Sequence, residues 1–437
     1  MNGHTYKNSF RIGGMFFITF FSALGAAPSS PCQAPMEDQC ETASCEVSIQ
    51  DYVELAAEDN SGLRAAYDRW QAALANVDFS DTLPDPRLSY GLFVKEVETR
   101  VGPQKHRLGA SQTIPWFGKL KHRRGVAVQA AVVAEEEFCL QYVALVTQLK
   151  KAFYEYYYLH QAVQITEANI QLVELVERVA QSQVRVGGSA ADVLQAQMEI
   201  SKLKDHLETV NERLVIAATR INAILNRQVD AELTLPPNLF EGLSRPEKIA
   251  EAQLEEANPM LRILCAQVGK HEQSRKLTRQ NRYPDVTVGV DWIQTDRALM
   301  ATPDSGKDPV VAKISINVPL WQSTYRAQEQ AATYRRQSAE DQFAQKRYEV
   351  QADFEDVLLK YKEADREIAL YEDTLIPQAE QTLSILQEAY EAGKADFERY
   401  LGAQRVLLDF QLKVEKARVQ RASVSADYDF LLGRIGC

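Results

Sequence analysis

The sequence predicts a mainly α-helical chain that also contains a few β-strands and is built from two similar halves. Residues 121–184 form one helical pattern without a proline. Two later segments, beginning near Val193 and Tyr400, carry apolar residues at the three-and-four spacing of a coiled coil. Four short segments alternate apolar with polar residues, which is typical of β-strands whose two faces meet different surroundings.

The composition is that of a folding chain with an acidic balance. Of the 437 residues, 45% are hydrophobic and 25% are charged, so the chain can bury a core. The formal net charge of −11 argues against nucleic acid or another polyanion as a partner.

Residues 1–25 have the features of a secretory signal peptide. Lys7 and Arg11 precede the apolar run 15–24, and small residues follow it. The run is shorter than the ~20 residues that a spanning helix needs, and no other segment reaches that length without charges. Residues 26–47 then form an N-terminal leader.

Three cysteines lie in the leader. In an oxidising compartment, Cys40 and Cys45 either pair or remain thiols. Cys32 has the position of a lipid-modified cysteine, but Ser30 and Pro31 before it differ from the small-residue box that this processing requires.

Landmarks recur in the same order in the two halves, roughly 200 residues apart. The pairs are Asn60–Arg64 with Asn258–Arg262, Pro84-Asp85 with Pro284-Asp285, Pro115-Trp116 with Pro319-Leu320-Trp321, and Leu194–Gln197 with Leu401–Gln404. Chance seldom gives such a series, so we interpret the chain as a duplication. Residues 48–240 are the first helix–strand–strand–helix–helix repeat, and residues 241–437 are the second.

Each repeat contributes two expected strands of about ten residues. Their apolar positions are Leu88, Tyr90, Leu92 and Val94; Leu108, Ala110 and Ile114; Val286, Val288, Val290 and Trp292; and Ile314, Ile316, Val318 and Leu320. Residues between them, such as Thr287, are expected on the opposite face.

Each strand pair is followed by a helix of unusual length and a return helix. Residues 121–184 correspond to a rod of about 95 Å. The heptad positions of the return helices are Val193, Ala196, Ile200, Leu203, Leu207, Val210, Leu214, Ala217, Ile221 and Ile224 in the first, and Tyr400, Ala403, Leu407, Phe410, Val414, Ala417, Val424, Tyr428 and Leu431 in the second. Arg421 is the one break, and we interpret both stripes as packing seams.

The number of strands limits the architecture. Strands of this length suit a tilted membrane-spanning barrel, but the smallest closed barrels need about eight strands, and an open edge in lipid is prohibitive. Either the sheet is a small soluble one, or several chains contribute to a shared barrel. A secreted chain with rods of this length favours the shared barrel.

The junction between the second strand and the long helix fits such a barrel. Pro115 ends the ladder hydrogen bonds, and Gly118 permits the turn into the helix. The aromatics expected at the membrane–water interface are Trp116, Phe117 and, at the matching position, Trp321. Lys119 is expected on the water side. The alternative is an ordinary connection with core aromatics.

With these features the chain resembles the TolC-like outer-membrane efflux protein family. The motifs that carry the resemblance are Ala257-Asn258-Pro259, Tyr283-Pro284-Asp285, Ser111-Gln112-x-x-Pro115 with Phe117-Gly118-Lys119, and the turns Val186-Gly187-Gly188 and Ala392-Gly393-Lys394. The resemblance implies a homotrimer with a twelve-stranded barrel in the outer-membrane lipid and a twelve-helix periplasmic tunnel. It also implies a tip that closes like an iris and docks a periplasmic adaptor (membrane fusion) protein.

The gate departs from the family pattern. Drug-exporting members carry two aspartates, three residues apart, near the start of the last helix, where this chain has Arg399 and Gly402. Asp192, Asp396 and Glu398 are the candidates that place acidic charge nearby, beside Arg399. The alternative is that these carboxylates only favour the helix N-termini.

The tip turns at 186–191 and 392–395 are expected farthest from the strands. Small residues there would let a helical hairpin of the adaptor approach closely. The residues expected to take part in docking are Gly187, Gly188, Val193, Gly393 and Leu401. The alternative is that the glycines serve only as helix-ending turns.

We therefore expect a passive outer-membrane duct. The energy for export would come from an inner-membrane pump of the resistance-nodulation-division type. The six histidines show no metal-ligand spacing and no glycine-rich phosphate loop is present, so enzyme activity, a metal site and a cofactor are not expected. The alternative is a soluble periplasmic coiled-coil adaptor or scaffold. Drugs and metal ions both remain as cargo classes.

Overall fold

The computed structural model describes residues 47–185, 187–300 and 303–434. Contacts join these residues into one compact unit. The expected signal peptide, the leader up to residue 46, and Cys32, Cys40 and Cys45 lie outside the described residues.

Both halves have the same order of elements, as predicted. The first half contains α1 (Ile49–Asp59), α2 (Ser61–Ser80), β1 (Arg87–Leu92), β2 (Gln104–Ile114), α3 (Lys119–Arg185) and α4 (Ala190–Ile224). The second contains α5 (Glu251–Ala257), α6 (Pro259–Gln280), β3 (Val286–Thr295), β4 (Val310–Ile316), α7 (Gln322–Leu370), the π-helical segment η1 (Tyr371–Leu375), α8 (Ile376–Glu391) and α9 (Phe397–Leu431).

The four strands form one antiparallel sheet in the order β1-β2-β3-β4. The prediction of strand pairs is confirmed, but β1 and β4 have 6 and 7 residues, fewer than the about ten expected. Val94 lies beyond the end of β1. β4 ends at Ile316, and the next residue, Asn317, accepts a hydrogen bond from the backbone N–H of Asp285 through its side chain. Pro319 then has no N–H with which to continue the ladder.

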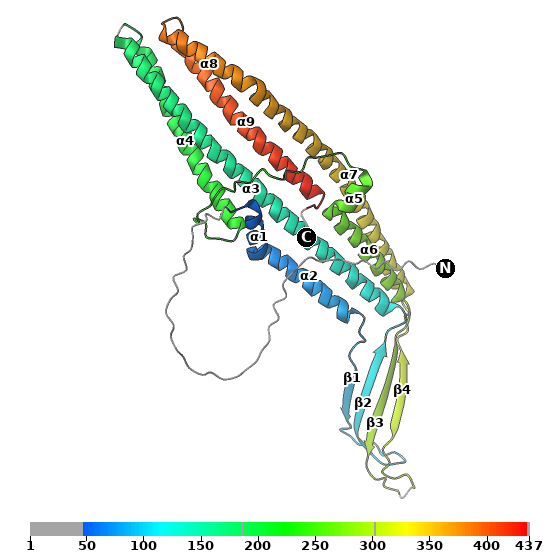
Figure 1. Ribbon diagram of the computed structural model, residues 1–437. Helices are drawn as coiled ribbons and strands as arrows, with labels where there is room; N and C mark the ends of the chain where they lie inside the picture. The colour runs from blue at the N-terminus through cyan, green and yellow to red at the C-terminus, as the bar shows by residue number, and fades with distance from the viewer. Residues whose placement is uncertain (1–46, 186, 301–302, 435–437) are drawn as a thin grey trace, which may run out of the picture. The chain divides into compact units, whose positions relative to one another are not determined.

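The long helices run from the sheet to two turns at their far ends (Figure 1). α3 has 67 residues, or about 100 Å at the usual helical rise, which confirms the predicted rod. In the second half, η1 joins α7 to α8. Pro377, in the first turn of α8, cannot donate a backbone hydrogen bond to η1, which accounts for the local widening of the helix there.

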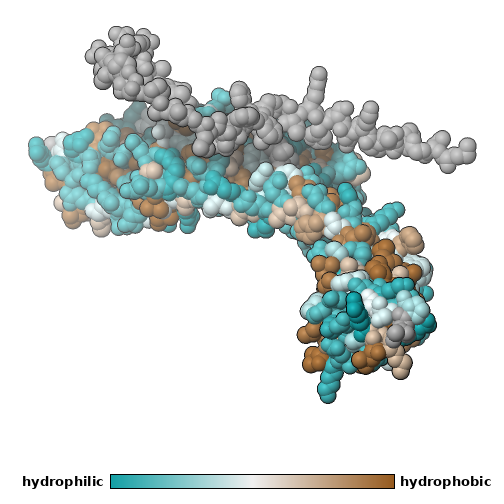
Figure 2. Space-filling view, turned by 90° about the horizontal axis from the view of Figure 1, so that it is seen from below, coloured by the Kyte–Doolittle hydropathy of each residue, from teal (hydrophilic) through white to brown (hydrophobic). Residues whose placement is uncertain are grey.

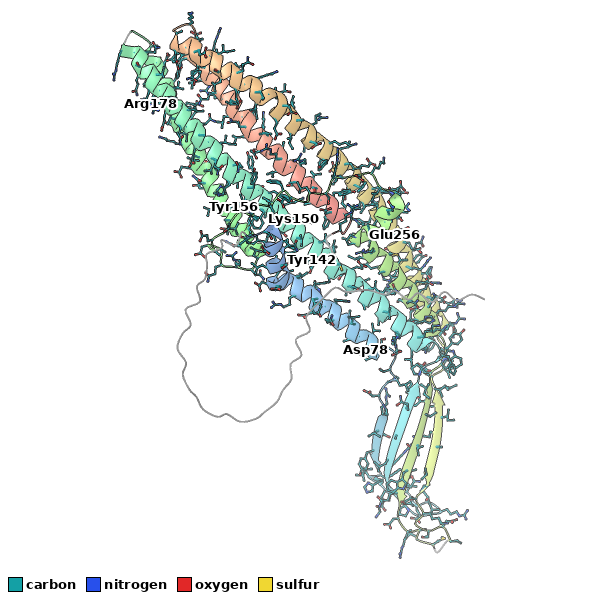
Figure 3. The ribbon with its side chains drawn as sticks, viewed as in Figure 1. Asp78, Tyr142, Lys150, Tyr156, Arg178 and Glu256 are labelled. Carbon is teal, nitrogen blue, oxygen red and sulfur yellow. The ribbon has the colours of Figure 1, made fainter. Side chains whose placement is uncertain are left out.

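The return helices α4 and α9 pack through the predicted seams. Every heptad residue expected on them is buried or partly buried. Arg421, the one break, forms an ion pair with Asp365 of α7, Nη1 to Oδ1 at 3.1 Å. The largest cluster joins residues of α1, α3, α4 and α9 around the middle of α3, where Figure 3 labels Tyr142 and Tyr156.

The two halves also make the same tertiary contact. Asn60 accepts from the backbone N–H of Leu63 and donates to the carbonyl of Ile224 at 3.1 Å. Asn258 accepts from Leu261 and donates to the carbonyl of Leu431 at 2.9 Å. In each half one asparagine thus caps the helix before the strands and binds the last turn of the return helix.

Candidate functional site

One face of the sheet is apolar and exposed. Leu88, Ala110, Val290 and Ala312 form one cross-strand row on it. Leu88 is 84% exposed and Ile314 is 79% exposed. Figure 2 shows apolar side chains over this part of the molecule. A folded chain seldom leaves a continuous apolar face uncovered unless it meets a partner or a membrane.

The opposite face is mostly polar, with Ile293 and Val311 as the apolar residues on it. Asp291 of β3 is buried there and accepts ion-pair hydrogen bonds from Arg107 of β2 and Lys313 of β4. Gly109 lies opposite Asp291 in the β2–β3 register. A Cβ at Gly109 would overlap with the Asp291 carboxylate and the Ser89 hydroxyl, so a larger residue there would have to displace these side chains. Thr287 is on this face too, at the strand position next to Val288, and the alternation predicted for β3 is confirmed.

Both outer strands of the described sheet have a free edge. β1 pairs only with β2, and β4 pairs only with β3. Every residue of both strands is exposed. Backbone groups on such an edge are available to pair with a strand of another chain.

At the junction of sheet and helices, motifs from the two halves meet. Trp116 stacks on Tyr283, with ring centroids 5.6 Å apart, and its backbone N–H donates to Asp285 at 2.8 Å. Gly118 has φ +87°, as the predicted turn requires. Lys119 is buried and donates to Asp285 and to the carbonyl of Tyr283, a pairing across the two halves that sequence spacing does not reveal. Its place on the water side of a membrane stays a prediction.

The three predicted interface aromatics differ in exposure. Phe117 is 86% exposed and Trp321 is 76% exposed, whereas Trp116 is partly covered by Tyr283. All three lie between the strands and the long helices. Their contact with a membrane–water interface stays a prediction.

The tip turns have the same backbone form in the two halves. Gly187 and Gly393 have positive φ, +102° and +69°. The residue after each, Gly188 or Lys394, donates its N–H to the carbonyl five residues earlier, at 2.8 Å in both turns. These are glycine helix ends of the Schellman type. A Cβ at Gly188 would lie 2.9 Å from the backbone of Gln183, whereas Gly187 and Gly393 have open space.

The two predicted apolar docking residues are not freely exposed. Leu401 is 1% exposed and belongs to the cluster of α3, α4, α8 and α9, and Val193 packs against that cluster. Leu401 therefore cannot present its side chain to a partner, and that expectation was wrong. Leu194, its counterpart in the first half, is 61% exposed, and Met198 one turn later is 58% exposed. Sequence reasoning missed this pair because a heptad stripe shows only the inward positions.

The four candidate gate residues differ in the contacts that they make. Asp192, in the first turn of α4, accepts a hydrogen bond of 3.1 Å from the hydroxyl of Tyr390 at the end of α8. Burial, and then the Asp192 carboxylate, raise the pKa of Tyr390 to about 12. This bond joins the tips of the two halves.

The remaining gate candidates lie at the start of α9. Asp396 is the N-cap of α9 and makes no side-chain capping bond. Glu398 lies 3.7 Å from Arg405, which also binds Glu199 of α4 in a bidentate pair. Arg399 is exposed. Both interpretations, gate charge and helix-end charge, still apply to these residues.

Within the ranges that the structure describes, no helix is both long and apolar enough to cross a bilayer. The same ranges contain no group of three or more His, Cys, Asp or Glu side chains placed to hold a metal ion. Two features therefore remain for a function to explain. One is the sheet with an exposed apolar face, and the other is the pair of tip turns joined by the hydrogen bond from Tyr390 to Asp192.

The sequence model of the outer membrane efflux protein family matches residues 52–227 and 252–434. The chain belongs to this family. A search of curated proteins finds no match.

Solved structures of bacterial outer-membrane proteins have a similar fold. The outer membrane protein VceC of Vibrio cholerae is 18% identical, with 88% of this chain and 96% of that chain covered and a TM-score of 0.73. The open state of the MtrE outer membrane channel of Neisseria gonorrhoeae is 17% identical over 88% of each chain, with a TM-score of 0.74. CusC is 16% identical over 88% and 92% of the two chains, with a TM-score of 0.74.

Proposed function

We propose that this chain is one third of an outer-membrane efflux channel, a homotrimer in which three sheets close into a twelve-stranded barrel. The observation that carries the proposal is the exposed apolar face of a four-stranded sheet with two free edges. Four strands cannot close, and a spanning sheet with open edges is prohibitive in lipid. Twelve strands remove every edge.

The sheet has the geometry for this closure. Neighbouring strands are antiparallel throughout, so β4 of one chain runs antiparallel to β1 of the next. The apolar face then contacts lipid, and the face with Asp291 lines the interior. An even number of antiparallel strands with an apolar exterior and a polar interior is the pattern of outer-membrane barrels.

The helices would form the tunnel in the periplasm. The matching Asn60 and Asn258 contacts, the matching glycine turns and the two separate family matches support a duplication with repeats at 48–240 and 241–437. Two long hairpins per chain give a wall of twelve helices in the trimer. The channel is a passive duct that carries small molecules or metal ions, with energy from an inner-membrane pump of the resistance-nodulation-division type.

The tips are proposed to dock the periplasmic adaptor. The supporting observation is that Leu194 and Met198 are exposed beside an open glycine turn. Leu194→Glu should abolish adaptor binding and leave the trimer intact. Val215→Glu, at a 66% exposed position farther along α4, is the matched control. Equal adaptor binding by both variants would overturn docking through Leu194.

The oligomeric state tests the channel itself. We expect the full-length protein to fractionate with the outer membrane and to elute in detergent with the mass of three chains by light scattering. The soluble periplasmic scaffold is the alternative, and it would require a stable, folded monomer in buffer without detergent. Such a monomer would overturn the proposed channel.

A further inference from the structure

The polar face of the sheet carries more positive than negative charge. Arg87 and Lys313 stand at the two ends of one cross-strand row, with Ser111 and Gly289 between them. Arg107 lies four residues from Ser111 along β2, or about 13 Å. Asp291 is the one carboxylate among these strand residues, and it pairs with Arg107 and Lys313 but not with Arg87. We call the four charged residues the basic band, and its net charge is +2 per chain.

The carboxylate is already used within the band. Asp291 is 2% exposed and binds both Arg107 and Lys313, each with a side chain that is 44% exposed. Arg87 is exposed and has no ion pair with a described residue. The buried anion therefore holds two cations in place, and their outer sides face the space in front of the sheet.

The surrounding loops do not offset this charge. Residues 93–105, which are the β1–β2 loop and the first two residues of β2, contain three basic and two acidic residues, and residues 296–309 contain two basic and three acidic residues. Several of them pair with one another, such as Lys105 with Asp296 at 2.7 Å. The basic band is thus a local excess of positive charge in a chain whose total charge is −11.

We propose that the basic band makes the barrel interior selective for anions, so that negatively charged solutes pass it more readily than cations of the same size. The inference rests on the proposed trimer, in which three bands give a net charge of +6 around one lumen. The band is about one Debye length tall at 0.1 M salt, so its charges act together on a passing ion. Walls of low dielectric strengthen the field in such a passage.

The test is the reversal potential of purified trimers in a planar bilayer under a tenfold KCl gradient. We expect chloride to be favoured over potassium. Arg87→Gln combined with Lys313→Gln removes the net charge and should bring the permeability ratio to about one. Arg297→Gln, which removes an exposed cation in the loop after β3, should change the ratio little. Arg87→Gln alone breaks no described ion pair, so it reports selectivity even if the double variant fails to assemble.

The possible results distinguish failure of the proposed anion selectivity from failure of the proposed trimeric channel. A wild-type channel that favours potassium, or a ratio that Arg87→Gln leaves unchanged, overturns the basic band. If trimers form but pass no current, crystals soaked in iodide and in rubidium decide the matter by anomalous scattering. Iodide beside Arg87 supports the inference, and rubidium or neither ion overturns it. Absence of a trimer would overturn the proposed channel, and the inference about its lumen would fall with it.

Discussion

Replacing Ile314 by lysine tests which face of the sheet meets lipid. Ile314 lies near the middle of β4 and opposite Val288, and it is 79% exposed. A lysine on the lipid face of a barrel costs about 2–4 kcal/mol at the bilayer midplane. A trimer contains three copies, so the cost is about 6–12 kcal/mol. Because each 1.4 kcal/mol is a factor of ten, trimer formation should fall by more than about ten-thousandfold.

The matched control is the next residue. Ser315 lies on the polar face opposite Thr287, so Ser315→Lys places the same charge in the lumen at nearly the same depth and should change stability by about 0.5 kcal/mol or less. The assay refolds each urea-unfolded variant into lipid vesicles and measures the fraction that migrates as a heat-modifiable trimer. Equal trimer fractions, or a greater loss for Ser315→Lys, would refute the assignment of the faces.

Two further predictions concern the tips and the repeat. Because the neutral form of Tyr390 is favoured in the folded state, its contribution to the free energy of unfolding is constant below pH 10 and falls between pH 10 and 12. Asp192→Asn should lower the pKa of Tyr390, measured by tyrosinate absorbance as the difference from Tyr390→Phe; an unchanged titration would contradict the contact. Asn60→Ala and Asn258→Ala should each lower the free energy of unfolding by about 1–2 kcal/mol. Denaturant titration checks this, and a loss in only one variant would argue against equivalent roles in the two halves.

Periodicity in the sequence was sufficient to predict where the long helices lie and which of their residues are buried. Apolar residues at heptad spacing predicted α4 and α9, and none of those residues is exposed in the structure. The absence of proline predicted the length of α3. These features are local, because a helix is specified by side chains three and four residues apart. The count of four strands was also sufficient to exclude a barrel made by one chain.

Only the tertiary structure decided which of two matched residues is available to a partner. Leu194 and Leu401 hold corresponding positions, yet the first is exposed and the second is buried where α9 meets α3, α4 and α8. The sequence places both beside a seam, and burial depends on how many helices surround that seam.

Charges that pair across the two halves were equally hidden in the sequence. Lys119 and Asp285 are far apart along the chain and meet at 2.7 Å. Arg107 and Lys313 meet over Asp291 only once β2, β3 and β4 take their register. The sequence by itself determined the helices and the alternation of the strands, because each is set by near neighbours. Partners from distant segments were decided by the fold, since strand register and helix packing bring them together.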